Sequence, residues 1–135
     1  MTMDNEQLTM DNYSQSVMEG ILLVAHGSRA PQAGQTVEKI AAMVRCRLPE
    51  LPIQVAYMEF CRPDIGTGLS LLVKQGVISI KVIPYFLFEG IHIQEDIPAE
   101  LAAFQEKHPY ISITMSKTLG VDKRLADIII ERIMG

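Results

Sequence analysis

Short apolar runs alternate along the chain with segments whose apolar residues recur at helical spacing. The first run, 21–25, reads Ile-Leu-Leu-Val-Ala and is typical of a strand buried on both faces. Similar runs predict three further strands, over 53–58, 77–83 and 111–115. A segment with apolar residues every three or four positions follows each strand, and these segments predict four helices, which begin near Pro31, Asp64, Asp96 and Val121.

Each predicted helix has one apolar face, and two of them carry end signals. The apolar positions are Val37, Ile40, Ala41, Val44 and Leu48 in the first helix, Ile65, Leu69, Leu72 and Val73 in the second, Ile97, Leu101 and Phe104 in the third, and Val121, Leu125, Ile128, Ile129 and Ile133 in the last. Gly76 is expected to close the second helix. Asp96 is expected to cap the third, with Pro98 in its first turn.

Strict alternation of strands and helices predicts an α/β fold, with a parallel sheet covered by helices on both faces. For four such units the expected strand order is 2-1-3-4, as in flavodoxin-like sheets. Strands 1 and 3 are then neighbours whose connections leave toward opposite faces of the sheet. Ligands bind such sheets at this switch point, outside the carboxyl ends of the strands.

Charge is distributed unevenly over the 135 residues, which have a formal net charge of −4. The first twenty residues contain acidic side chains and no Lys or Arg, so residues 1–19 are expected to be a flexible acidic tail and 20–135 a single domain. Charges in that domain cancel, which argues against nucleic-acid binding. The apolar runs are too short to span a membrane. Cys46 and Cys61 fit free thiols in a reducing cytoplasm.

Two histidines and a glutamate are predicted to meet at the carboxyl edge of the sheet. His26 directly follows the first strand, Glu59 ends the second, and His92 lies in the loop after the third. Two imidazoles and a carboxylate can bind a divalent transition metal and leave a coordination position open. His108 precedes Pro109 at a helix end, where a structural role is expected.

Loop residues around this edge are candidates for substrate binding. Ser28 follows a glycine before a helix, where backbone N–H groups can hold an anion, although a tight turn explains the pair more simply. Arg29 and Arg62 could pair with carboxylates, or could be solvated loop charges. The aromatic run of the loop after the third strand could contact a large flat ligand or pack into the core, and consists of Tyr85, Phe86, Leu87 and Phe88.

Three short motifs, in order, resemble the small class II tetrapyrrole chelatases, the CbiX-like sirohydrochlorin chelatases. They are His-Gly-Ser-Arg at 26–29, Ala-Tyr-Met-Glu-Phe at 56–60, and the run from Pro-Tyr-Phe-Leu-Phe-Glu-Gly-Ile-His at 84–92 to Asp-Ile-Pro at 96–98. The resemblance covers nearly all of residues 21–134 and excludes the acidic tail. Ile91 departs from the pattern, since the family often has a basic residue there, which bears on one contact to a substrate carboxylate.

The resemblance implies insertion of Co²⁺, Fe²⁺ or Ni²⁺ into sirohydrochlorin, in cobalamin, sirohaem or related biosynthesis, with no organic cofactor. It matches His26 and His92 to the family's two site histidines and Glu59 to its strand-end glutamate. It also implies a homodimer with a shared cleft, because the long members of the family carry two such domains in one chain.

Three alternatives remain at the level of sequence. A carrier that holds a metal or tetrapyrrole without turnover would use the same residues. A histidine phosphatase would need an arginine directly before the histidine, where this chain has Ala25. A flavodoxin-like interaction domain would need neither histidine.

Overall fold

The computed structural model describes residues 18–135, apart from the side chain of His92. The predicted acidic tail therefore lies almost wholly outside the described residues. Nine elements follow one another along the described chain: β1 (Glu19–Ala25), α1 (Pro31–Arg47), β2 (Ile53–Tyr57), α2 (Ile65–Lys74), β3 (Ser79–Pro84), η1 (His92–Asp96, a π-helical turn), α3 (Ile97–Lys107), β4 (Ser112–Met115) and α4 (Lys123–Met134). β1 starts at Glu19, one residue inside the predicted tail.

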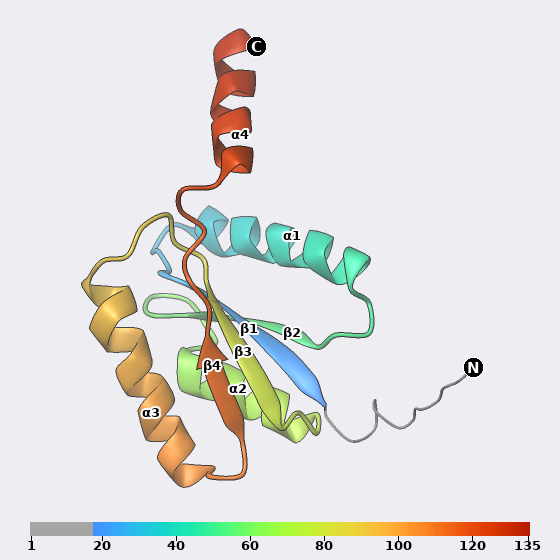
Figure 1. The fold of residues 1–135 in the computed structure, drawn as a ribbon, viewed down its shortest axis with the longest axis vertical. Helices are drawn as coiled ribbons and strands as arrows, with labels where there is room; N and C mark the ends of the chain where they lie inside the picture. Colours follow the sequence, from blue (N-terminus) through green and yellow to red (C-terminus); the bar gives the residue numbers. More distant parts are fainter. Residues whose placement is uncertain (1–17) are drawn as a thin grey trace.

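The four strands form one parallel sheet in the order β2-β1-β3-β4, as predicted (Figure 1). Successive side chains of β1 point to opposite faces, so that Leu22 and Val24 join one apolar cluster and Leu23 and Ala25 join the other. Because both faces of this central strand are buried, its sequence reads as a continuous apolar run.

The two faces are covered unequally. α2 and α3 cover one face, where Leu69 and Leu72 of the first helix and Ile97 of the second are almost fully buried. α1 covers the other face, over β1 and β2, through Val37 and Ala41. α4 continues past the carboxyl ends of β3 and β4 (Figure 1), and none of its residues, all of which the structure describes, is buried. The sheet has helices on both faces, as predicted, and α4 is not one of the helices buried against it.

The ends of the second and third helices differ from each other in how they are capped. α2 begins after Asp64 and is followed by Gly76 at φ +94°, both as predicted. The Asp64 carboxylate also caps the helix, since it accepts a hydrogen bond from the Thr67 N–H at 2.8 Å. Asp96 does not cap α3, and that prediction is wrong. It lies in a right-handed helical conformation itself, because η1 leads directly into the helix.

Two apolar residues of the first predicted helix are more exposed than their spacing predicts: Val44 of α1 is 38% exposed, and Leu48, which follows α1 as its C-cap, is 49% exposed. The part of the chain that the structure describes has no helix long and apolar enough to cross a membrane.

Both cysteines are free thiols, as expected. His108 has the expected structural role, since its ring stacks on Phe104 with centroids 3.9 Å apart.

Candidate active site at the carboxyl edge of the sheet

The side chains of His26 and Glu59 meet where β1 and β2 end. The distance from His26 Nε2 to Glu59 Oε2 is 2.8 Å, and the two side chains are 44% and 47% exposed. Parallel pairing of β1 with β2 places the residues after the two strands beside each other, and the Glu59 N–H donates to the His26 carbonyl oxygen at 3.1 Å. The pair is thus held by its backbone as well as by its side chains, while remaining open to solvent.

The turn after His26 requires glycine. Gly27 has φ +97°, and a Cβ built there would lie 1.8 Å from the Glu59 carbonyl oxygen. The loops after β1 and β2 can approach this closely only because Gly27 has no side chain. The Cys61 thiol donates to the Ser28 carbonyl oxygen at 3.3 Å and joins the same two loops a second time.

Phe86 borders the pair from the loop after β3. Its ring meets the His26 imidazole edge to face, with centroids 6.5 Å apart and an interplanar angle of 78°. Phe86 is half-buried and also packs against the apolar cluster beneath α2 and α3. The ring therefore limits the positions that the imidazole can take on its apolar side.

His92 is placed by its backbone only, at the start of η1, and its side chain lies outside the described residues. Its role as a metal ligand stays a prediction. Among the side chains that the structure does describe, no group of three or more His, Cys, Asp or Glu could hold a metal ion. The described part of the site thus contributes two of the three predicted ligands, His26 and Glu59.

The loop candidates divide into exposed residues and structural ones. Leu87 and Phe88 are exposed at 60% and 77%, as a surface for an external apolar ligand would be. Tyr85 is half-buried and belongs to the apolar cluster beneath α1. The Ser28 hydroxyl accepts a hydrogen bond from the Ala30 N–H at 3.1 Å, so it stabilises its own turn.

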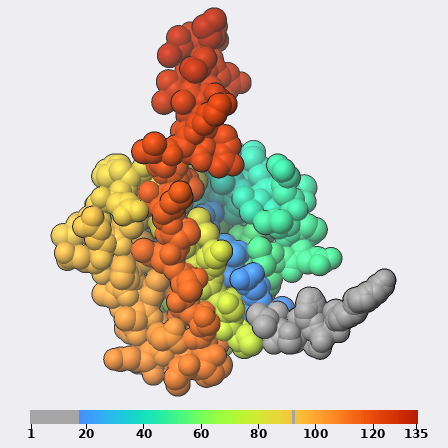
Figure 2. Space-filling model, in the orientation of Figure 1, coloured from blue at the N-terminus to red at the C-terminus, as the bar shows by residue number. Residues whose placement is uncertain are grey.

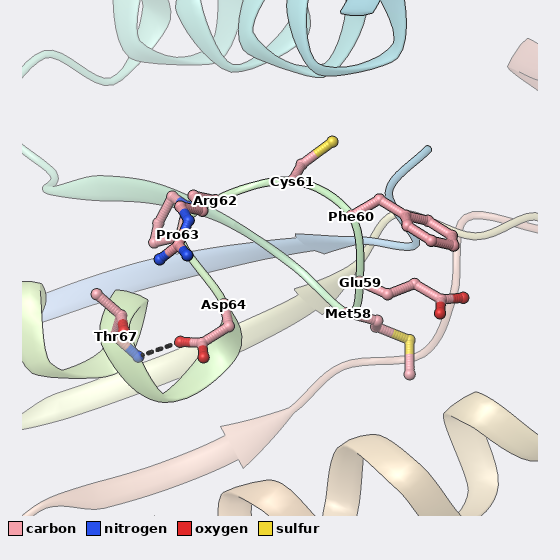
Figure 3. Close-up of a pocket in the computed structure, with 8 residues that line it drawn as sticks. All are labelled: Met58, Glu59, Phe60, Cys61, Arg62, Pro63, Asp64 and Thr67. Atoms are coloured by element: carbon pink, nitrogen blue, oxygen red, sulfur yellow. Dashed lines mark hydrogen bonds between the residues drawn. The ribbon is translucent and has the colours of Figure 1, made fainter. Parts of the chain in front are cut away.

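The two arginines have different surroundings. The Arg29 guanidinium lies over the ring of Phe60, 4.6 Å from its centroid, and Phe60 has φ +69°, an unusual value for a bulky residue. Arg62 lines an open hollow of about 410 Å³ with Glu59, but the two side chains point to opposite ends of it (Figure 3). The structure thus keeps Arg62 apart from the Glu59 carboxylate.

Sequence reasoning missed an acidic groove beside Glu59. A hollow of about 380 Å³ lies between the end of β2 and the start of α3, where Asp96 and Glu100 line it together with Glu59. Burial raises the pKa of the Glu100 carboxyl, and the nearby carboxylates of Asp64 and Asp96 raise it further. The sequence feature that could have predicted this groove is the pair of acidic residues, Asp96 and Glu100, four positions apart at the start of the third helix.

Comparisons with known proteins agree with this fold. A family model described as CbiX matches residues 20–134. The chain is 33% identical to a sirohydrochlorin ferrochelatase of Priestia megaterium over 86% of this chain and 44% of that protein. It is 36% identical to a sirohydrochlorin cobaltochelatase of Methanococcoides burtonii over 85% of this chain and 94% of that protein.

A crystal structure of the sirohydrochlorin chelatase SirB from Bacillus subtilis subspecies spizizenii, in complex with cobalt, has the same fold. It superposes with a TM-score of 0.83 at 30% identity, over 87% of this chain and 50% of that one. The chain thus spans about half the length of the ferrochelatase and of SirB, and nearly the whole length of the archaeal cobaltochelatase. By its sequence, its strand order and the loops that carry His26 and Glu59, the chain belongs to the CbiX family.

Proposed function

We propose that the protein is a sirohydrochlorin chelatase that inserts a divalent metal, Co²⁺ or Fe²⁺, with Ni²⁺ as a third candidate. The observation that carries the proposal is the solvent-accessible pair of His26 and Glu59, 2.8 Å apart at the carboxyl edge of the sheet. Relatives named for cobalt and for iron insertion support the substrate class. The free thiols of Cys46 and Cys61 fit a reducing cytoplasm.

The pair has the chemistry that metal insertion needs. A metal ion must lose water ligands and enter the ring while the pyrrole N–H protons leave. An imidazole nitrogen binds Co²⁺ and Fe²⁺ less tightly than a cysteine thiolate would, so it can release the metal to the ring. The Glu59 carboxylate lies 2.8 Å from His26 Nε2, within hydrogen-bond distance, so it can orient the imidazole and take up a proton when the metal arrives. His92, on the neighbouring strand-end loop, is the proposed second imidazole.

The rim of the site has features suited to a flat macrocycle that carries carboxylates. Leu87, Phe88 and Ile91 expose apolar surface on the loop after β3. Across the edge, Phe60 supports the Arg29 guanidinium, which can pair with a substrate carboxylate. The apolar side chains would contact the ring and exclude water from it during metal transfer.

Two copies of the chain complete this cleft in our proposal. The site of one chain is an open edge rather than an enclosed pocket, with half of the His26 and Glu59 side-chain surface accessible to solvent. The chain also spans half of SirB, so two copies would supply the second half that such relatives carry in one polypeptide. The proposed assembly is a homodimer with the macrocycle between the two carboxyl edges.

An absorbance time course on metal-free sirohydrochlorin tests the proposal. Co²⁺, Fe²⁺ and Ni²⁺ are supplied separately under anaerobic conditions, and uncatalysed insertion is subtracted. We expect multiple turnovers, and a loss of about 100-fold or more in His26→Ala and Glu59→Gln, since a positioned acid–base group contributes about 10² to 10⁴. His108→Gln, a histidine change at the far end of α3, is the matched control and should retain the wild-type rate.

Two results would contradict the proposal. A spectral change that stops at one equivalent per site would identify a carrier instead of an enzyme. No change with any of the three metals, from a protein whose circular dichroism is that of a folded α/β domain, would leave only the flavodoxin-like fold.

A further inference from the structure

The β4–α4 connection (residues 116–122) lies at the same edge of the sheet as the candidate active site. Because β4 runs parallel to β3, the residues that follow both strands leave the sheet on the same side. The Ser116 N–H donates to the Val82 carbonyl oxygen, and the Leu119 N–H to that of Phe86, each at 2.9 Å. Figure 2 shows the connection running beside the loop after β3. The connection therefore forms part of the rim of the proposed cleft.

The β4–α4 connection and the loop after β3 approach each other closely. A Cβ built at Gly120 would lie 1.8 Å from the Leu87 carbonyl oxygen, so the absence of a side chain at Gly120 permits this approach. A hollow of about 370 Å³ lies between the two segments, where Lys117 faces Leu87, Phe88 and Glu89. The backbone of Lys117 is thus fixed against the most exposed apolar part of the rim.

The Lys117 ammonium group keeps its hydrogen-bond donors for an external partner. Two carboxylates lie near it, those of Glu89 and Asp122, but among the described residues no ion pair or side-chain hydrogen bond includes this ammonium group. The Asp122 carboxylate instead accepts hydrogen bonds from the Arg124 side chain at 2.7 and 2.8 Å. These bonds lower the pKa of Asp122, and the charge of Lys117 contributes less to that shift. A lysine has three donors to offer.

The apolar loop after β3 has no cation of its own. From Tyr85 to Ile91 it contains neither Lys nor Arg, so a carboxylate of a ligand that lies on it must find its partner on a neighbouring segment. Lys117 is exposed and borders this loop directly. The hollow therefore combines an apolar surface with a positive charge, as a site for a ring with an acidic side chain would.

Lys117 and Arg29 stand at opposite ends of the carboxyl edge. The Arg29 guanidinium lies over the ring of Phe60, which follows β2, whereas Lys117 follows β4. β2 and β4 are the two outer strands of the sheet, and they are three strand spacings, or about 14 Å, apart. His26 and the apolar loop after β3 lie between these ends. A flat ligand over the edge would thus have one cation at either end of it.

We propose that Lys117 binds a carboxylate of the tetrapyrrole at the end of the cleft opposite Arg29. The inference rests on the proposed chelatase function and names the residue that holds the ring at this end. A macrocycle with carboxylates around its whole rim can offer one to each cation while its centre lies near His26. The two contacts together select a ring that carries acidic groups on opposite sides.

An equilibrium titration with metal-free sirohydrochlorin, followed by absorbance without any metal, tests the contact apart from catalysis. Lys117→Gln should raise the dissociation constant about tenfold, because a charge-assisted hydrogen bond to the carboxylate is lost. Lys117→Arg keeps the charge and should bind as the wild type does. Lys107→Gln, which removes the same charge at the far end of α3, is the matched control and should also bind normally.

Steady-state insertion gives a second readout. Lys117→Gln should raise the KM for sirohydrochlorin about tenfold and leave kcat unchanged, because the lost contact holds the ring equally in the ground state and the transition state. The affinity for Co²⁺ alone should not change, since Lys117 contacts no proposed metal ligand.

The outcomes separate this contact from the chelatase proposal. If Lys117→Gln, with the circular dichroism of the wild type, binds sirohydrochlorin as tightly as Lys107→Gln, the inference is overturned and the chelatase proposal stands. A wild type that binds no sirohydrochlorin would overturn both. Tenfold weaker binding by Lys117→Gln, in a protein whose wild type inserts no metal, would support the contact and contradict the chelatase proposal.

Discussion

Replacement of Gly27 by alanine should damage both stability and the active site, for two separable reasons. Gly27 has φ +97°, a conformation that costs an L-residue about 1–2 kcal/mol. Replacing glycine also lowers the conformational entropy of the unfolded chain, which stabilises the folded state by about 0.4–1 kcal/mol. The alanine Cβ would in addition lie 1.8 Å from the Glu59 carbonyl oxygen, whereas carbon and oxygen normally approach to about 3.3 Å.

The backbone must therefore open by about 1.5 Å between the two loops, which adds about 1–3 kcal/mol of overpacking strain. We expect Gly27→Ala to lose about 2–4 kcal/mol in free energy of unfolding. The displaced residue is Glu59 itself, so a shift of 1 Å or more would separate its carboxylate from His26 beyond hydrogen-bond distance. Metal insertion should fall about 100-fold, the cost of misplacing a catalytic group by about 1 Å.

Urea denaturation followed by circular dichroism measures the first effect and the insertion rate measures the second. Gly76→Ala is the matched control, because Gly76 has φ +94° but a Cβ there meets nothing within 4 Å. It should lose about 1 kcal/mol or less and keep its activity. If Gly27→Ala behaves like Gly76→Ala in both assays, the close approach of the two loops does not position Glu59, and our reasoning about the site is refuted.

Two further predictions concern the loops and the α2 cap. Gly120→Ala, where a Cβ would lie 1.8 Å from the Leu87 carbonyl oxygen without a positive φ, should displace the apolar loop, raising the KM for the tetrapyrrole more than it lowers the kcat. Asp64→Ala should lose about 0.5–2 kcal/mol at pH 7, because the Asp64 carboxylate caps α2 at the Thr67 N–H. The hydrogen bonds from Thr67 lower the Asp64 pKa, so the cap stabilises the fold above the ordinary carboxyl pKa, and this contribution is lost as the pH falls through the lowered value. Urea titrations of Asp64→Ala and wild type should therefore converge at acid pH, below the lowered pKa of Asp64. Asp64→Asn is the uncharged acceptor control, and a gap that stays constant with pH would count against the cap.

Part of the site depends on long-range pairing and was still predictable. His26 and Glu59 are far apart in sequence, yet the strand order expected for four βα units placed both at one edge, and the structure pairs them. The prediction succeeded because parallel strands bring all their carboxyl ends to one side of the sheet. The placement of the Arg29 guanidinium over Phe60 was not predictable, because it follows from the left-handed backbone of Phe60 in a tight loop.

The residues that were predicted wrongly show what spacing along the sequence cannot predict, namely whether a residue caps a helix and whether it is buried. Asp96 has the composition of a helix cap, but η1 continues the helical backbone through it. Val44 and Ile129 have the spacing of core residues and are exposed. Apolar spacing indicates that a helix has one apolar face, but it does not indicate which surface packs on that face.

The sequence by itself determined the alternation of strands and helices, the parallel sheet and the group of residues at its carboxyl edge. These follow from local periodicity and from chain connectivity, which any compact arrangement of the same segments must obey. Only the tertiary structure decided that Gly27 lets two loops meet, that Arg62 points away from Glu59, and that no residue of α4 is buried. Those outcomes depend on distances between segments remote in sequence, which side-chain volume and loop geometry set and which no local pattern encodes.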